Sequence, residues 1–156
     1  MTSLTIGFDP ALFDPTVSTR EAHLKWVIVV DAALPAGRAV NAAVCVAAAT
    51  QDRVTGLLGP DVADASGSAH PGLPWIGCSI LAAPGSRLGE LRAKAGARED
   101  VFVADMPAAA QATRVYAEYR DEIAARAAGE HDYVALSLVG PRNRIDRLVG
   151  GLPLLA

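Results

Sequence analysis

Four short runs of apolar residues recur along the chain, and the stretches between them carry the spacing of amphipathic helices. The run at residues 25–31 is continuous and β-branched, which is typical of a strand buried on both faces of a sheet. Further apolar runs at 75–82, 101–104 and 133–139 predict three more strands. The pattern therefore indicates a sheet of about four strands, with the first run in its interior.

The segment at 38–50 predicts the first helix. Val40, Val44 and Ala47 follow one another at spacings of four and three, which gives one apolar stripe. We expect this stripe to face the sheet. The other residues of the helix are nearly all small, so we expect it to approach the sheet closely.

Three more helices are expected between or after the later strands. Ser86 is placed to cap a helix that ends near Gly96. The longest helix is expected over 108–128, and a short one follows Gly140 and Pro141. Strands that alternate with helices predict a sheet covered on both faces.

The whole chain, residues 1–156, is expected to form one domain, because its length and hydrophobic fraction of 51% suffice for a single core. Residues 1–23 are rich in Pro, Asp and Thr and predict an extended arm, and 24–156 form the body. Residues 51–74 predict a long irregular connection. Compact domains rarely keep such a loop without a use, so its segment at 67–72 is a candidate functional region.

The charge balance weighs against nucleic acid as a partner. The net charge is −3, whereas phosphate backbones are bound mainly by clustered Lys and Arg. Arg142, Arg144 and Arg147 form a local cluster, which we expect on the solvated face of a short helix. No signal-peptide pattern and no apolar run of membrane-spanning length is found, so a cytoplasmic location without a membrane partner is expected.

Cysteine and histidine spacing offers no metal or cofactor site. Cys45 and Cys78 fit no paired motif and are expected to be buried free thiols. His23, His70 and His131 show no metal-ligand spacing. No phosphate-binding or dinucleotide motif occurs, so neither a metal nor a cofactor is expected.

Two segments carry a family resemblance. Residues 26–30, the turn at 34–38 and the alanine-rich helix resemble the first strand, turn and helix of type II peptidyl-tRNA hydrolases. Residues 134–141 and the apolar end of the chain resemble that family's closing strand, Gly-Pro turn and short helix. The chain is more similar still to the sister family called domain of unknown function 2000. The resemblance implies a three-layer α/β/α fold with a mixed sheet of about four strands, and a homodimer.

The departures from the hydrolase pattern bear on activity. The first basic position of the hydrolase helix is kept as Arg38, but the second falls on Val40. The positions of the hydrolases' glutamine and histidine fall on Val44 and Ala47. Three polar positions replaced by apolar ones predict a site reburied as core, so the inherited chemistry is expected to be lost or rebuilt.

The opening of the first helix is the best physical candidate for a ligand site. Free N–H groups at Gly37 and the helix dipole favour an anion, and Arg38 adds a fork of donors. Alternatively, Gly37 only makes the turn and Arg38 is solvated. Asn41 either orients a substrate carbonyl or ties down the long loop, since a buried amide needs a partner.

Three residues outside this helix complete the candidate site. Asp105 follows the third strand at the edge where open α/β sheets hold ligands, and it matches an active-site aspartate of the hydrolases by resemblance. Alternatively it caps the next helix. Thr113 either accompanies it or faces solvent. His70 is either a general base, if its loop folds over the helix opening, or simply an exposed loop residue.

Three functions are consistent with these residues. The first is binding of, or action on, a small acyl, amide or ester ligand, with Asp105 or His70 moving a proton and Asn41 orienting a carbonyl. The second is hydrolysis of peptidyl-tRNA, which the acidic composition disfavours. The third is a non-catalytic dimeric interaction module. Whether the protein is an enzyme does not follow from the sequence.

Overall fold

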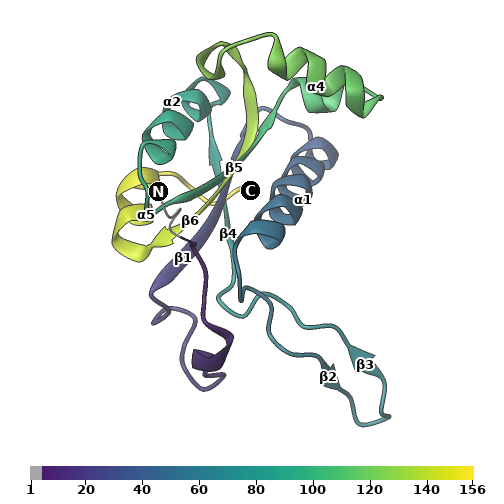
Figure 1. Ribbon diagram of the computed structural model, residues 1–156, viewed down its shortest axis with the longest axis vertical. Coiled ribbons are helices and arrows are strands. Elements are labelled where there is room, and N and C mark those ends of the chain that lie inside the picture. The colour runs from purple at the N-terminus through teal and green to yellow at the C-terminus, as the bar shows by residue number, and fades with distance from the viewer. Residues whose placement is uncertain (1–4) are drawn as a thin grey trace.

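The computed structural model describes residues 5–156 and contains one mixed sheet flanked by helices (Figure 1). Residues 1–4 of the expected arm lie outside the described part. The strands are β1 Leu24–Asp31, β2 Val62–Ala63, β3 Ala69–His70, β4 Ser79–Ala83, β5 Phe102–Pro107 and β6 Tyr133–Pro141. The α-helices are α1 Ala36–Arg53, α2 Gly85–Gly96, α3 Ala109–Ala112, α4 Tyr116–Ala124 and α5 Arg142–Val149. Short 3-10 turns occur at Pro10–Leu12 and Ala128–Glu130.

The main sheet has the strand order β4-β1-β6-β5. β1 runs parallel to β4 and antiparallel to β6, and β5 is antiparallel to β6. The sheet is therefore mixed and four-stranded, as the sequence predicted. The continuous apolar run lies in its interior, where Val27 is opposite Leu138 of β6 and Ser79 of β4.

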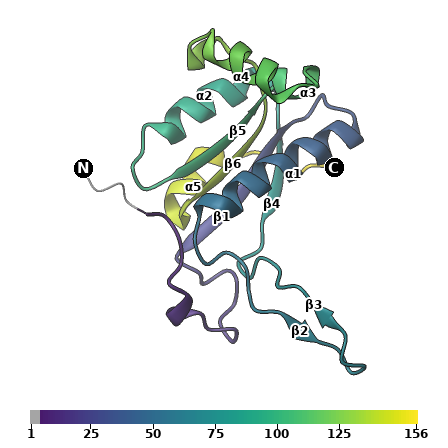
Figure 2. The ribbon, with the colours of Figure 1, turned by 45° about the vertical axis from the view of Figure 1, so that its right-hand side comes forward.

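Alternate side chains of β1 enter two separate cores. Trp26, Ile28 and Val30 pack with α1 on one face, while Val27 and Val29 pack with α2 and α5 on the other. Figures 1 and 2 show α1 on one side of the strands and α2 with α5 on the opposite side. Each face of a strand that is buried on both sides needs its own helical cover.

A buried polar chain crosses the core on the α1 side. The indole Nε1 of Trp26 donates to the Ser137 hydroxyl at 2.8 Å, and the Ser137 and Thr50 hydroxyls are 2.6 Å apart. Thr50 also donates to the carbonyl oxygen of Val46 at 2.7 Å. These bonds satisfy polar groups that would be costly if left unpaired, and they fix α1 against β1 and β6.

The face that α1 buries differs from the expected stripe. Ala39, Ala42, Val46 and Thr50 are buried, whereas Val40 and Val44 are each 60% exposed. The prediction that Val40 and Val44 rebury a lost site as core is therefore wrong. Val40 and Val44 lie about 80° to 160° round the helix axis from the buried residues, at about 100° per residue. Small Ala39 and Ala42 make the close approach instead.

The expected long helix over 108–128 is also wrong, because it is interrupted. α3 ends at Ala112, and Thr113 and Val115 take extended backbone conformations before α4 begins. The Thr113 hydroxyl donates to the Ala109 carbonyl at 3.0 Å, so the side chain closes the end of α3. α4 buries none of its residues, and Tyr116 is 75% exposed.

Two cap assignments fail for a local reason. Ser86 makes no capping bond, since α2 begins one residue earlier at Gly85, after Pro84. Asp105 lies inside β5 and does not cap the following helix. The second strand is also shorter than expected, because only Ser79–Ala83 pairs with β1.

The residues before β1 and between α1 and β4 form the lower part of the molecule in Figure 1. The buried ring of Phe8 packs edge-on against Trp75 at 4.8 Å between centroids, and its N–H donates to Thr55. Arg142 of α5 donates to the Thr19 carbonyl and ties the arm to the body. β2 and β3 form a hairpin that projects from the domain, with Val62 paired to His70.

The end of the chain covers the outer edge of β4. The Ala82 N–H donates to the Pro153 carbonyl at 2.9 Å, and the Leu155 N–H donates to the Ile80 carbonyl at 2.9 Å. The apolar tail thus acts as a short additional strand beside β4. None of the helices within 5–156 is both long and apolar enough to cross a membrane.

Candidate functional site

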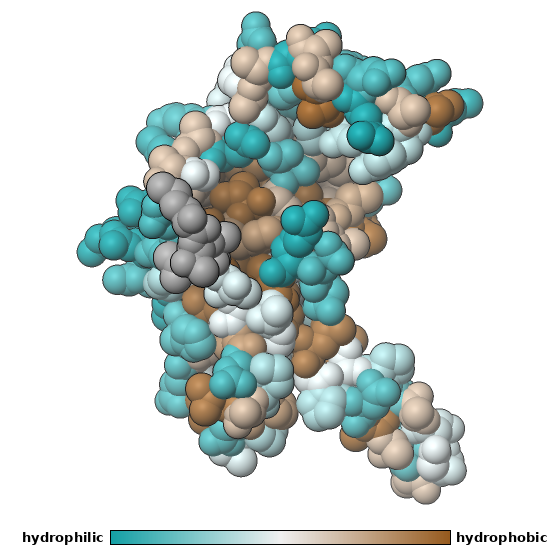
Figure 3. Space-filling view, in the orientation of Figure 1, coloured by the Kyte–Doolittle hydropathy of each residue, from teal (hydrophilic) through white to brown (hydrophobic). Residues whose placement is uncertain are grey.

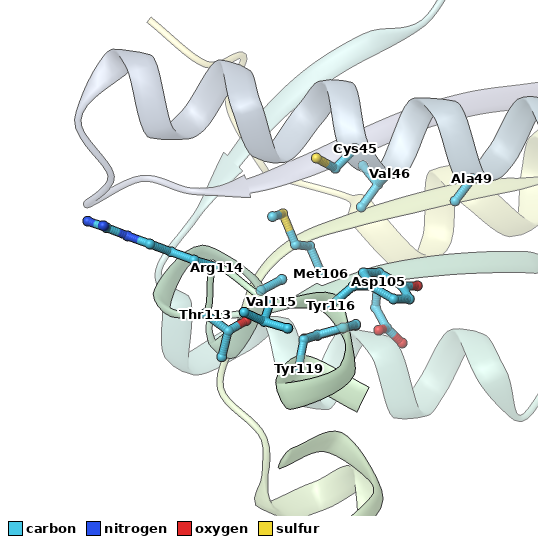
Figure 4. Close-up of a pocket in the computed structure, with 11 residues that line it drawn as sticks. Cys45, Val46, Ala49, Asp105, Met106, Thr113, Arg114, Val115, Tyr116 and Tyr119 are labelled. Atoms are coloured by element: carbon cyan, nitrogen blue, oxygen red, sulfur yellow. The ribbon is translucent and has the colours of Figure 1, made fainter. Parts of the chain in front are cut away.

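A hollow of about 430 Å³ opens between α1, the end of β5 and the α3–α4 segment, and we call it the α1 hollow. Its lining residues are Cys45, Val46, Ala49, Asp105, Met106, Ala110, Thr113, Arg114, Val115, Tyr116 and Tyr119. Figure 4 shows the α1 side chains on one side of it and Thr113, Val115 and Tyr119 on the other, while Arg114 extends away. An apolar hollow with a few polar groups is the usual form of a small-ligand site.

Asp105 lies at the rim of this hollow but is held from the opposite face of the sheet. Arg92 of α2 donates from Nε to its Oδ2 at 2.6 Å. The next residue, Met106, is buried with α1, since consecutive strand residues point to opposite faces. In Figure 4 the Asp105 carboxylate points away from Cys45.

Aromatic groups surround the Asp105–Arg92 ion pair. The Arg92 guanidinium carbon lies 5.3 Å from the ring centroid of Tyr133, whose hydroxyl donates to the Ala128 carbonyl at 2.8 Å. Burial raises the pKa of Tyr119, and the nearby Asp105 charge raises it further. Burial likewise raises the pKa of Tyr133. Both phenols therefore remain neutral hydrogen-bonding groups at neutral pH.

Gln111 joins two of the expected site residues at the start of α1. Its Nε2 donates to the Arg38 carbonyl at 2.9 Å and to Asn41 Oδ1 at 3.2 Å, and Arg38 Nε donates to its Oε1 at 3.1 Å. Asn41 is thus bonded to α3 and not to the long loop. Gly37 is exposed, and no atom lies within 4 Å of where its Cβ would be.

His70 does not join the other expected residues. It lies on β3 of the projecting hairpin, where its Nε2 is 3.1 Å from Asp64 Oδ2. Figure 1 shows this hairpin at the end of the molecule opposite α4. Hydrogen bonds from Ser66, then from His70, lower the pKa of Asp64 to about 2. The geometry therefore separates His70 from Asp105 and from the opening of α1.

Four residues at or beside the site were not singled out in the sequence: Arg92, Gln111, Tyr119 and Cys45 as an exposed thiol. The expectation that Cys45 is buried is wrong, because its side chain is exposed at the α1 hollow. Only its position round the helix could have shown this, since Cys45 lies about 120° round the axis from Ala39 and about 100° from Val46. Cys78, by contrast, is half-buried as a free thiol, and burial raises its pKa to about 12.

No group of three His, Cys, Asp or Glu side chains within 5–156 could hold a metal ion. The polar groups of the α1 hollow are instead three hydroxyls, the Cys45 thiol, the Asp105 carboxylate, which is already paired with Arg92, and Arg114, whose side chain extends away. They can accept and donate hydrogen bonds to a neutral polar group. The walls provide apolar and aromatic contacts.

The fold defines an α/β protein of a type already seen in a solved structure. The protein of unknown function Atu0240 from Agrobacterium tumefaciens strain C58 matches with a TM-score of 0.80 over 86% of this chain and 99% of that chain, at 16% sequence identity. That likeness shows a shared fold. No curated protein matches the sequence.

The family follows from the sequence itself. The family described as Protein of unknown function (DUF2000) matches residues 24–156, so the chain belongs to it. The match covers the whole body and begins at the first residue of β1. The description of the family assigns no activity.

Proposed function

We propose that this protein binds a small ligand with an apolar part and an acyl, amide or ester group in the α1 hollow. The observation that supports this most directly is the convergence of α1, β5 and α4 on one open cavity of about 430 Å³. Its walls are mainly apolar, and its few polar groups come from separate elements. Such an arrangement suits a ligand whose carbonyl is fixed at one point and whose remainder is buried.

The position of this hollow refines the expectation of a site at the first turn of α1. Cys45 and Ala49 lie about two and a half and three and a half turns into the helix, while Arg38 and Asn41 are bound to Gln111 at its start. We propose that Gly37, Arg38 and Asn41 form the entrance and that Gln111 holds α3 in place there. The Tyr119 hydroxyl would then donate to the carbonyl group of the ligand inside, while Thr113 Oγ1, whose proton is donated to Ala109, would accept from an amide N–H.

Asp105 serves best as a positioning group in this proposal. Its Oδ2 accepts from Arg92, and its charge lies near the Tyr119 phenol, so it orients groups around the hollow. A catalytic role in hydrolysis would need its carboxylate to reach the ligand. We propose that the three-layer fold is related to that of the type II peptidyl-tRNA hydrolases, and that the hydrolase activity was not inherited with it.

The test uses N-acetyl-phenylalanine amide and the corresponding ethyl ester as probes, with binding followed by NMR of the ¹⁵N-labelled protein. We expect shifts at Cys45, Thr113 and Tyr119. Ala49→Trp should fill the hollow and abolish the shifts. Ala48→Trp is the matched control, because Ala48 is exposed on the same helix and does not line the hollow.

Release of ethanol from the ester, or of tRNA from peptidyl-tRNA in a parallel assay, would show whether binding leads to hydrolysis. Release of tRNA that is lost in Arg38→Ala and Asp105→Ala would establish the peptidyl-tRNA hydrolase alternative. Absence of any shift up to millimolar probe, in a protein that gives a folded spectrum, would refute the proposed ligand class.

A second candidate function, a dimeric interaction module, is favoured by one observation. Val40 and Val44 are large apolar residues, each 60% exposed, one turn apart on the outer surface of α1. We propose that this surface packs on a second copy if the protein is a homodimer. Sedimentation velocity should then show a dimer that Val44→Asp converts to a monomer, while a wild-type monomer at the highest concentration measured contradicts it.

A further inference from the structure

The two outer edges of the sheet differ in how they are covered. The edge of β4 is paired with the segment at Pro153–Leu155, as described above. β5 lies at the other end of the sheet, and its only strand partner in 5–156 is β6. No backbone hydrogen bond from the described residues reaches its outer side. An uncovered edge is a template for an additional strand.

The open edge is short and has a defined end. A register shift lies between Met106 and Pro107, and proline has no N–H to donate. The stretch from Phe102 to Met106 is therefore the part that can pair. In Figure 1 β5 lies between α2 and α1. Figure 3, in the same orientation, shows apolar surface in the hollowed region between these helices.

A second hollow flanks the same strand on the other face, and we call it the α2 hollow. It has a volume of about 570 Å³, and it is lined by Arg92, Ala93, Gly96, Ala97, Val101 and Val103. Val103 faces α2, whereas Met106, at the α1 hollow, faces α1. The open edge therefore has one hollow on each face of the sheet, about three residues apart along β5.

We propose that the open edge of β5 binds an extended peptide segment of a partner protein. The segment adds a strand to the sheet and places an apolar side chain in the α1 hollow and an acidic side chain in the α2 hollow. The contact of the apolar side chain rests on the ligand-binding role proposed for the α1 hollow. A peptide group of the bound segment would then be the amide group of that ligand. Main-chain bonds provide the affinity in such complexes, and pockets for side chains provide specificity.

Strand geometry sets the spacing of the two side chains. Side chains alternate between faces, so residues three apart point to opposite faces and lie about 10 Å apart along the strand. This matches the separation of Val103 and Met106 on β5. The recognised pattern is an apolar and an acidic residue with two residues between them.

Arg92 is the group in the α2 hollow that favours an acidic side chain. Arg92 is the one charged residue that lines the α2 hollow, and its Nε is occupied by Asp105. The guanidinium has further N–H donors, and no acceptor for them is found among the described residues. A carboxylate can accept two such bonds at once, and because Asp105 already balances the Arg92 charge, these oriented bonds are what recognise it.

The probe is the peptide acetyl-Glu-Thr-Thr-Val-Thr-Thr-Glu-amide. It has a glutamate three residues before and after its valine, so it presents the pattern in either strand direction. We expect NMR shifts at the β5 amides and at Arg92 Nε, with slower hydrogen exchange of the outward β5 amides. Replacement of both glutamates by lysine should weaken binding at least tenfold, and N-methylation of alternate peptide nitrogens on the paired side should abolish it.

Variants of the protein test the two faces separately. Ala93→Trp should fill the α2 hollow and weaken peptide binding at least tenfold, because Ala93 is exposed and lines that hollow. It should leave binding of N-acetyl-phenylalanine amide unchanged. Ala48→Trp, outside both hollows, should change neither.

Three outcomes would overturn the proposal. One is a folded protein whose β5 amides neither shift nor gain protection with the peptide. If N-acetyl-phenylalanine amide still shifts Cys45 and Tyr119, that result removes the peptide proposal alone. The second is a free protein that is dimeric in sedimentation and whose outward β5 amides are already protected from hydrogen exchange. The third is the same protection in a monomer, lost when residues 1–4 are deleted.

Discussion

Arg92 Nε donates to Asp105 Oδ2 at 2.6 Å, and this bond joins α2 to the edge strand β5. It holds the Asp105 carboxylate on the α2 face of the sheet, while the adjacent Met106 is buried with α1. Two consecutive residues of β5 therefore belong to different faces of the molecule. The carboxylate of the candidate acid is therefore turned away from the first helix, although both line the α1 hollow.

The coupling between Arg92 and Asp105 should be measurable but modest. The side chains are 33% and 23% exposed, so water screens part of their attraction. A double-mutant cycle with Arg92→Gln and Asp105→Asn, followed by urea unfolding, should give a coupling free energy of about 1 kcal/mol, lower at high salt. A coupling of zero at low salt would show that the pair does not form in solution.

Ser137 should be the most sensitive hydroxyl in the protein. Ser137→Ala removes the acceptor of Trp26 Nε1 and the partner of Thr50, both in the core. We expect a loss of about 1–3 kcal/mol in the free energy of unfolding. Ser79→Ala, at an exposed position of β4, should change it by less than about 0.5 kcal/mol. Equal effects of the two substitutions would contradict the buried chain of hydroxyls.

The face that α1 buries can be tested with two valines two residues apart. Val46→Ala empties volume in the core, since Val46 is 1% exposed, and should cost roughly 2 kcal/mol. Val44→Ala, at a position 60% exposed, should change stability by less than about 0.5 kcal/mol. Chemical denaturation measures both. A larger loss of stability for Val44→Ala than for Val46→Ala would support the buried stripe predicted from the sequence instead.

The two cysteines should react differently. Cys45 is exposed, while burial raises the pKa of Cys78 from 9.0 to about 12, so its reactive thiolate is scarce at neutral pH. A thiol reagent at about pH 8 should modify one cysteine in the folded protein and two after unfolding. Cys45→Ser should leave the folded protein unreactive. Rapid modification of both thiols in folded protein would show that Cys78 is accessible.

The same pKa shift predicts a pH dependence of stability. The unfolded thiol ionises near its ordinary pKa of 9.0 and the folded one only near 12. Stability from the neutral Cys78 thiol is therefore fully present below pH 9.0 and is lost as the pH rises towards 12. Comparison of wild-type and Cys78→Ala unfolding at about pH 8 and pH 10 measures it, with the wild type expected to lose more stability between the two.

The strands were predictable because their signal is local. The β-branched run around Ile28 has no polar position to turn outward, so it identifies an interior strand by itself. The run ending at Val139 is apolar except at Ser137, and the two strands are neighbours in the sheet. Helix boundaries were less predictable. Thr113 and Val115 interrupt the expected long helix through their backbone conformation, which composition alone does not reveal.

The candidate site was predictable only in part. Asp105 and Thr113 do meet at one hollow, and Arg38 and Asn41 are joined at the start of α1, but the joining residue is Gln111. His70 was grouped with them because a Gly-rich loop can fold in many directions. The loop instead forms a hairpin, in which His70 pairs with Asp64.

Residues near one another in the chain were enough to predict the four strands of the main sheet, their order along the chain and the close approach of an alanine-rich helix. The folded structure was needed to show which face α1 buries, to which side of the sheet Asp105 points, and which sheet edge the end of the chain covers. These depend on the rotation of a helix and the pairing of distant strands. Neighbouring residues do not fix either of them, because contacts between remote segments decide which arrangement fills the core.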